Sequence, residues 1–154
     1  MIAVGPLVAL DRIVGVEPGR RATALRNVPN TLAIFDSHFP LRPVLPGVLV
    51  LASMAELARI LLVGEADGTD RAAARAWQIA RADRIRYRHF IEPGDQMEIE
   101  VEVKDLGEQR ATFKAAVRVD GKLVTSASTL TMAKAVTYGG AIPPNPLATK
   151  GGLS

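Results

Sequence analysis

The chain of 154 residues contains no cysteine and only two histidines, His38 and His89. Without thiols, a disulfide framework, a zinc–thiolate centre and a cysteine nucleophile are all excluded. Two histidines without a nearby cluster of carboxylates form a weak set of metal ligands, so we expect no metal site. The reactive groups that remain are histidine, carboxylates and backbone amides.

Aromatic residues and excess charge are also scarce, with 4 Phe, 1 Trp, 2 Tyr and a net charge of +3. Sites for nucleic acid usually combine clustered basic residues with aromatic ones, and no such cluster occurs here, so we expect no nucleic-acid partner. The small positive charge suits an acidic protein partner better. Because cysteine is absent and the first residues do not resemble a secretory signal, the sequence predicts a cytoplasmic protein.

Long hydrophobic runs are limited to residues 44–63, close to the ~20 residues that cross a bilayer. Pro46, Glu56 and Arg59 interrupt this run, which argues against a membrane span and for a helix buried in a globular fold. Pro46-Gly47 suits the start of that helix, which we predict over residues 48–63. Since the helix is apolar almost all round, other structure should cover all its faces.

The remaining pattern is that of β-strands separated by turn residues. Asp120-Gly121 between alternating segments is a strong hairpin signal. One helix among these strands predicts an α+β fold in which a single antiparallel sheet packs on the helix, and the open sheet edges favour dimerisation. We expect one domain over residues 1–136 and a mobile C-terminal tail over 137–154. The predicted strands are residues 7–16, 21–28, 77–91, 96–104, 111–119 and 123–132.

The segment before the helix carries the candidate chemistry. Prolines at 40, 43 and 46 stiffen a loop that places His38 beside the helix start. The free N–H groups at Gly47 and Val48 could donate to a carbonyl oxygen that gains negative charge. Glycine at 47 would also let a thioester approach closely. A base beside an oxyanion site indicates proton abstraction next to a carbonyl, although His38 could instead be a partly buried ring bonded to backbone.

The run SHFPLRPVLPGVLVLASMAE, residues 37–56, resembles the signature GHFPxxPxxPGVLxxEAMAQ of the FabZ-type 3-hydroxyacyl-acyl-carrier-protein dehydratases. Residues 10–13, 86–97 and 119–122 also resemble segments of that family. The resemblance extends over roughly residues 5–134.

This resemblance implies a hotdog fold, in which an antiparallel sheet wraps a central helix and two copies join their sheets. It assigns His38 as the catalytic histidine and Gly47 as the backbone donor to the thioester carbonyl. It implies no cofactor, because the substrate arrives on the phosphopantetheine of an acyl carrier protein. Arginines at 42, 81, 84, 86 and 88 could dock that carrier, or could simply be solvated. Substrate contacts are expected from Phe39, Pro46, Val48, Leu49 and Ala52, with Met54 or Leu57 as further candidates for the acyl path.

The main departure from the family lies at Ala52, where the resemblance implies a catalytic glutamate from the neighbouring subunit. A proton donor for the departing hydroxyl is typically worth about 10²–10⁴-fold in rate. Glu56 lies one helical turn later and could replace it, or could pair with Arg59 instead. Asp36 could orient His38, or could bond to its own loop.

Three hypotheses follow for the function. The chain is a dehydratase that forms a 2-enoyl thioester, with Glu56 or bound water in the acid role. Alternatively, it is one subunit of a heterodimer whose homologous partner supplies the carboxylate. The third hypothesis is a thioesterase or an acyl-binding module. A thioesterase needs a positioned base and an oxyanion site, and both of these groups survive the loss of the acid. Of the three, we prefer the dehydratase.

Overall fold

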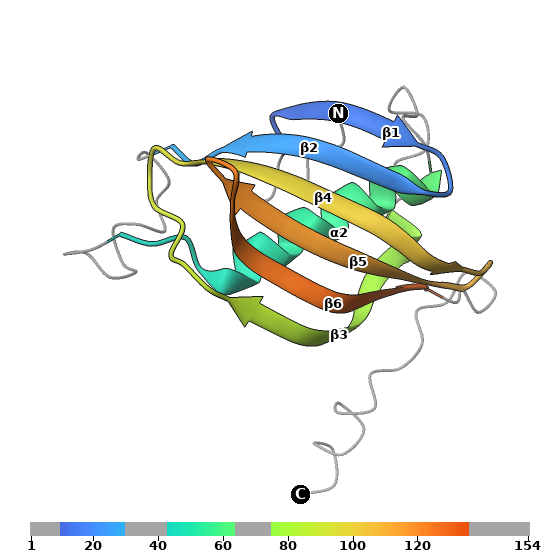
Figure 1. Cartoon of the computed structure of the whole chain (residues 1–154). Coiled ribbons are helices and arrows are strands. Elements are labelled where there is room, and N and C mark those ends of the chain that lie inside the picture. The colour runs from blue at the N-terminus through green and yellow to red at the C-terminus, as the bar shows by residue number, and fades with distance from the viewer. Residues whose placement is uncertain (1–9, 30–42, 64–74, 136–154) are drawn as a thin grey trace, which may run out of the picture.

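The computed structural model describes residues 10–29, 43–63 and 75–135 (Figure 1). In this part of the chain, one antiparallel sheet of six strands curves around a long helix, α2 (Figure 1). The strands follow the order β1-β2-β4-β5-β6-β3 across the sheet. The elements are β1 (Arg12–Glu17), β2 (Arg21–Asn27), α2 (Gly47–Val63), β3 (Trp77–Tyr87), β4 (Gln96–Leu106), β5 (Arg110–Val119) and β6 (Lys122–Lys134).

This architecture confirms the predicted α+β hotdog arrangement. β4, β5 and β6 are consecutive in sequence and in space, while β3 returns to the outer side of β6 and leaves one sheet edge open. Asp120 and Gly121 form the tight turn between β5 and β6, both with positive φ (51° and 78°), as the hairpin signal predicted. The sheet therefore has β1 at one edge and β3 at the other.

The predicted helix is confirmed, whereas the strand predicted over residues 77–91 ends earlier, at Tyr87. Arg88 and His89 both donate their backbone N–H to the carbonyl oxygen of Val124, at 2.8 and 3.4 Å. Two successive donors on one acceptor break the alternation of a strand ladder. His89 therefore lies beyond the end of β3, and the prediction that placed it within a strand was wrong.

The core lies between the concave face of the sheet and one face of α2. Phe113 and Leu130 face each other across β5 and β6 and are fully buried. Met54 and Leu57 contribute the helix side of the same cluster and are also fully buried. Burial of such side chains is the main stabilising term, about 1.5–3 kcal/mol each.

The opposite face of α2 is covered less well. Val48 is 68% exposed, and Leu49, Leu51 and Ala52 are half-buried. The expectation that other structure covers all faces of the helix is therefore met only in part within the described residues, because one curved sheet can enclose only one side of a helix. An apolar stripe remains along the first two turns of α2.

Several predicted residues and segments lie outside the described ranges. They are Asp36, His38, Phe39 and Arg42, together with the predicted tail over residues 137–154. No helix within the described ranges is long and apolar enough to span a membrane.

The start of α2 is held against the end of β3 by Tyr87. The Tyr87 hydroxyl donates to the carbonyl oxygen of Gly47 at 3.1 Å. A Cβ atom on Gly47 would lie 2.7 Å from Cε1 and Cζ of the Tyr87 ring. The space beside Gly47 is thus taken by Tyr87, which gives glycine a different reason from the substrate approach suggested by the sequence.

We predict that Gly47→Ala destabilises the protein by about 1 kcal/mol, the low end of overpacking costs, since the half-exposed ring can turn aside. In a Tyr87→Ala background the same change should be neutral or stabilising, because alanine is the better helix former. Tyr87→Phe keeps the ring and should keep the cost. Urea unfolding of wild type, the three single variants and the two double variants measures this, and equal costs of Gly47→Ala in the wild-type and Tyr87→Ala backgrounds would contradict the contact.

Candidate active site

The first turn of α2 presents backbone donors to its surroundings. The carbonyl oxygen of Pro46 accepts from the N–H groups of Leu49 and Val50, at 3.0 and 3.3 Å. The N–H groups of Gly47 and Val48 have no hydrogen-bond partner among the described residues. Such free donors at the positive end of a helix of 17 residues can stabilise a developing oxyanion. The geometry therefore suits the donor role that the sequence assigned to Gly47.

The structure brings together most of the predicted substrate contacts. Pro46, Val48 and Leu49 flank Gly47 in the first turn, and Ala52 follows one turn later on the same apolar stripe. Met54 and Leu57 lie on the other face of the helix, completely buried within the chain's own core. Along α2, an acyl chain can therefore contact Leu49 and Ala52, but it cannot reach Met54 or Leu57 without opening the core.

Glu56 is buried and paired within its own helix. Its side chain is 1% exposed, and its Oε2 accepts from Nη1 of Arg59 at 3.1 Å. The Nε of Arg59 donates in turn to the carbonyl oxygen of Trp77 at 2.8 Å, which ties the pair to β3. The ion pair that the sequence offered as an alternative role for Glu56 is thus formed.

One oxygen of this carboxyl, Oε1, is buried and has no hydrogen-bond partner among the residues that the structure describes. Burial raises the pKa of Glu56, and the adjacent Arg59 guanidinium opposes this rise only in part. A raised pKa favours the protonated form, which can donate a proton. Ala52, one turn earlier on the helix, is half-buried and offers only a methyl group.

A second buried charge, which the sequence analysis did not single out, lies on the other side of α2. Arg26 on β2 is 2% exposed and donates from Nη1 to Oγ of Ser53 at 2.8 Å. Ser53 donates to the carbonyl oxygen of Leu49 at 3.1 Å. Burial lowers the pKa of Arg26, while the nearby Asp11 raises it. The alternation of Ala22, Ala24 and Arg26 along one strand face is the signal that could have identified it.

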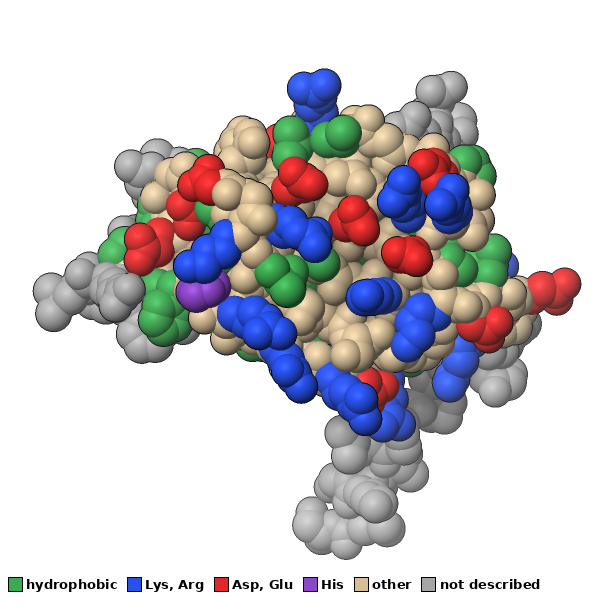
Figure 2. All heavy atoms as spheres, viewed as in Figure 1, with side chains coloured by type: hydrophobic (Ala, Val, Ile, Leu, Met, Phe, Trp, Pro, Cys, Tyr) green, Lys and Arg blue, Asp and Glu red, His purple; other side chains and the backbone are tan. Residues whose placement is uncertain are grey.

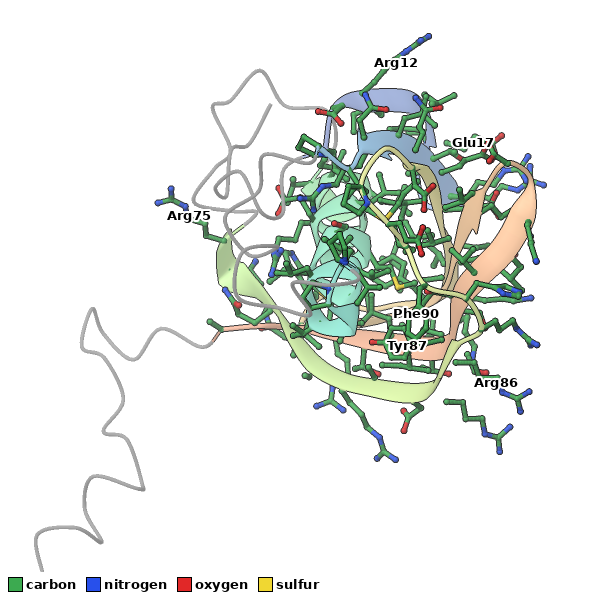
Figure 3. The ribbon with its side chains drawn as sticks, turned by 90° about the vertical axis from the view of Figure 1, so that its left-hand side faces the viewer. Arg12, Glu17, Arg75, Arg86, Tyr87 and Phe90 are labelled. Carbon is green, nitrogen blue, oxygen red and sulfur yellow. The ribbon has the colours of Figure 1, made fainter. Side chains whose placement is uncertain are left out.

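Four of the candidate docking arginines, at 81, 84, 86 and 88, are exposed on β3 or directly after it, and Arg42 lies outside the described residues. Figure 2 shows Lys and Arg side chains gathered over β3 and β6, and Figure 3 shows Arg86 pointing away from the helix, whereas Tyr87 lies beside it. Ile85 packs against the core, and Tyr87 is hydrogen-bonded to the start of α2. Arg81 is paired with Asp83 at 2.7 Å, and Arg84 adopts a left-handed backbone conformation, with φ of 52°.

Comparison with known proteins adds the family context. Residues 2–128 match the FabA-like domain family. The 3-hydroxyacyl-acyl-carrier-protein dehydratase FabZ of Bordetella petrii is 33% identical over 124 residues, which covers 79% of this chain and 82% of the relative.

Solved structures share the fold at lower identity. The dehydratase heterocomplex ApeI:P from Xenorhabdus doucetiae superposes with a TM-score of 0.58 at 18% identity, covering 79% of this chain and 96% of that one. A hypothetical thioesterase from Streptococcus pneumoniae, solved with coenzyme A, has a TM-score of 0.58 at 13% identity, covering 81% and 88%. With the match over residues 2–128 and one-third identity over most of its length, the chain belongs to the FabA-like family and, within it, is a relative of the FabZ dehydratases.

Proposed function

We propose that the protein eliminates water from a 3-hydroxyacyl thioester carried by an acyl carrier protein, giving the 2-enoyl product in fatty-acid or polyketide biosynthesis. The observation that carries this proposal is the free helix start at Gly47 in a chain of the FabZ family. The same donors would suit a thioesterase, but family membership favours dehydration. The proposal includes a cytoplasmic location and catalysis without a cofactor.

In the proposed reaction, the N–H groups at Gly47 and Val48 hold the thioester carbonyl oxygen. His38 removes the proton from the carbon next to that carbonyl, and the electron pair moves toward the oxygen. The electrons then return to form the carbon–carbon double bond as the 3-hydroxyl departs. Because hydroxide is a poor leaving group, it must receive a proton to leave as water.

The source of that proton is the point at which this chain differs from its family. Ala52 cannot supply it, and Glu56 is the one carboxyl in α2. Glu56 has a raised pKa and an unpaired Oε1, but its side chain is 1% exposed and bound to Arg59. We infer that Glu56 can act only after Arg59 moves, and that a carboxyl from a homologous partner subunit is the more accessible donor.

A partner subunit fits the surface that the chain leaves open. The stripe formed by Val48, Leu51 and Ala52 is apolar and incompletely covered, and β3 presents an unpaired sheet edge. We propose that a second hotdog subunit, identical or homologous, covers both features. A homologous partner would place its own carboxyl opposite Ala52.

We predict that the full chain with 3-hydroxybutyryl-carrier protein forms the 2-enoyl product, and that His38→Ala lowers the rate by about 10²-fold or more. Product formation is followed by mass spectrometry of the carrier. His89→Ala is the matched control, since His89 lies exposed beyond β3, and should keep most of the activity. Release of free thiol from acyl thioesters without enoyl product would instead indicate a thioesterase, and binding without turnover an acyl-binding module.

Restoring the acid provides a second prediction. Ala52→Glu should raise the dehydration rate of the isolated chain by about 10²-fold, because it returns a proton donor to the half-exposed stripe. Ala52→Gln, of the same size but unable to donate a carboxyl proton, should not. If both substitutions raise the dehydration rate equally, or if neither raises it, the proton comes from another position.

The state of Glu56 can be tested through stability. A raised pKa means that the folded protein binds this proton more tightly than the unfolded chain does, so wild type should lose stability relative to Glu56→Gln as pH rises above the ordinary glutamate range. Thermal unfolding of both proteins from pH 4 to 8 measures the difference in Tm. If the Tm of wild type instead rises relative to that of Glu56→Gln as the pH increases, the pairing with Arg59 outweighs the effect of burial on Glu56.

A further inference from the structure

The outer face of the sheet, turned away from α2, carries charges of opposite sign on different strands. Figure 2 shows acidic side chains in a line over β4 and Lys and Arg side chains over β6 and β3. Glu100 projects from this face of β4, because its neighbours Ile99 and Val101 are fully buried in the core. Arg86 projects from the same face of β3 and points away from the helix (Figure 3). The two charges therefore share one surface.

Glu100 and Arg86 are the two ends of one row across the sheet. The successive register partners from β4 to β3 are Glu100, Ala116, Ser126 and Arg86. Three strand spacings, about 14 Å, separate the two ends, so the charges do not meet while their side chains stand out from the sheet. Within the described ranges, neither side chain forms an ion pair. Each charge is thus available to a partner outside this chain.

The order of this row makes the face complementary in charge to itself. Consider a second copy packed on it, related by a twofold axis that runs parallel to the strands between β5 and β6. β4 of each copy then lies over β3 of the other. Glu100 of one copy faces Arg86 of the other, and the symmetry forms the same pair again across the axis. The residues nearest the axis, Ala116 and Ser126, are small and do not keep the faces apart.

The next row extends the same division of charge. Glu98 lies two residues earlier on the outer face of β4. Arg88 lies at the same level just beyond β3, where its N–H donates to the carbonyl oxygen of Val124 at 2.8 Å. Neither side chain has an ion-pair partner in the part of the chain that the structure describes. The acidic side and the basic side of the face are therefore each more than one residue long.

We propose that two copies of this chain associate through the outer faces of their sheets, held by reciprocal ion pairs between Glu100 and Arg86. This contact is separate from the apolar stripe of α2 and from the edge of β3, so it joins two-subunit assemblies back to back. Since the face offers charges and small side chains, ionic attraction supplies much of the affinity, and salt should weaken it. The proposal does not depend on the dehydratase function.

Sedimentation velocity of the full chain over a range of concentrations tests this, with NaCl raised from about 0.05 to 0.5 M. At low salt, wild type should form a species with twice the mass of the one that persists at high salt. Glu100→Lys and Arg86→Glu should each weaken this step about tenfold or more, because like charges then face each other. An equal mixture of the two variants should restore it. The double variant should restore it too, at the net charge of wild type.

Two matched controls change the charge by the same amount elsewhere. Glu108→Lys lies in the turn between β4 and β5, and Arg12→Glu lies on β1. Both should leave the doubling step unchanged, and thermal unfolding of every variant reports whether the fold is kept.

The proposal is overturned if wild type never doubles in mass at low salt, if the controls weaken the step as much as the row variants do, or if neither the mixture nor the double variant restores it. It is also overturned if Arg86→Glu weakens binding of acyl carrier protein while neither row variant alters the mass of the protein, because the face would then dock the carrier. These measurements use no substrate turnover, so a failure of the proposed dehydratase activity would leave their outcome unaffected.

Discussion

The packing of α2 into the concave face of the sheet is the constraint on which the other features of this protein depend. Met54 and Leu57 are completely buried against Phe113 and its neighbours, so the helix cannot rotate about its axis without exposing large apolar side chains. Tyr87 fixes the start of the helix through the carbonyl oxygen of Gly47. Together these contacts determine which N–H groups are presented at the helix start and in which direction.

Because α2 is held in one orientation about its axis, its residues differ in whether a substrate or a partner can reach them. Ala52 lies on the half-exposed stripe, where a partner or a substrate can reach it. Glu56, one turn later, is covered and held by Arg59, which is itself attached to the backbone of β3. Two positions that are equivalent in sequence periodicity thus differ in access. A side chain at position 52 can therefore meet a substrate or a partner subunit, whereas the carboxyl at position 56 cannot do so while it is paired with Arg59.

The buried polar groups around the same helix differ in how well they are hydrogen-bonded. Arg26 is bonded to Ser53, whereas Oε1 of Glu56 and Oγ1 of Thr125 have no hydrogen-bond partner within the part of the chain that the structure describes. An unpaired buried polar atom usually destabilises a fold, and such atoms concentrate where a protein binds or reacts. Both unpaired atoms adjoin α2, one near its middle and one beside its first turn.

The sequence by itself determined the fold class, the helix, predicted over residues 48–63 and observed over 47–63, and the family, because hydrophobic periodicity, turn residues and the run from Ser37 to Glu56 are local patterns. It also identified both possible roles of Glu56, since residues three apart on a helix are neighbours. Tertiary structure alone decided that Glu56 is covered, that Tyr87 occupies the space beside Gly47, and that Thr125 is buried. Each of these depends on contacts between a helix and strands far away in the chain, and such contacts are fixed by packing rather than by spacing in the sequence.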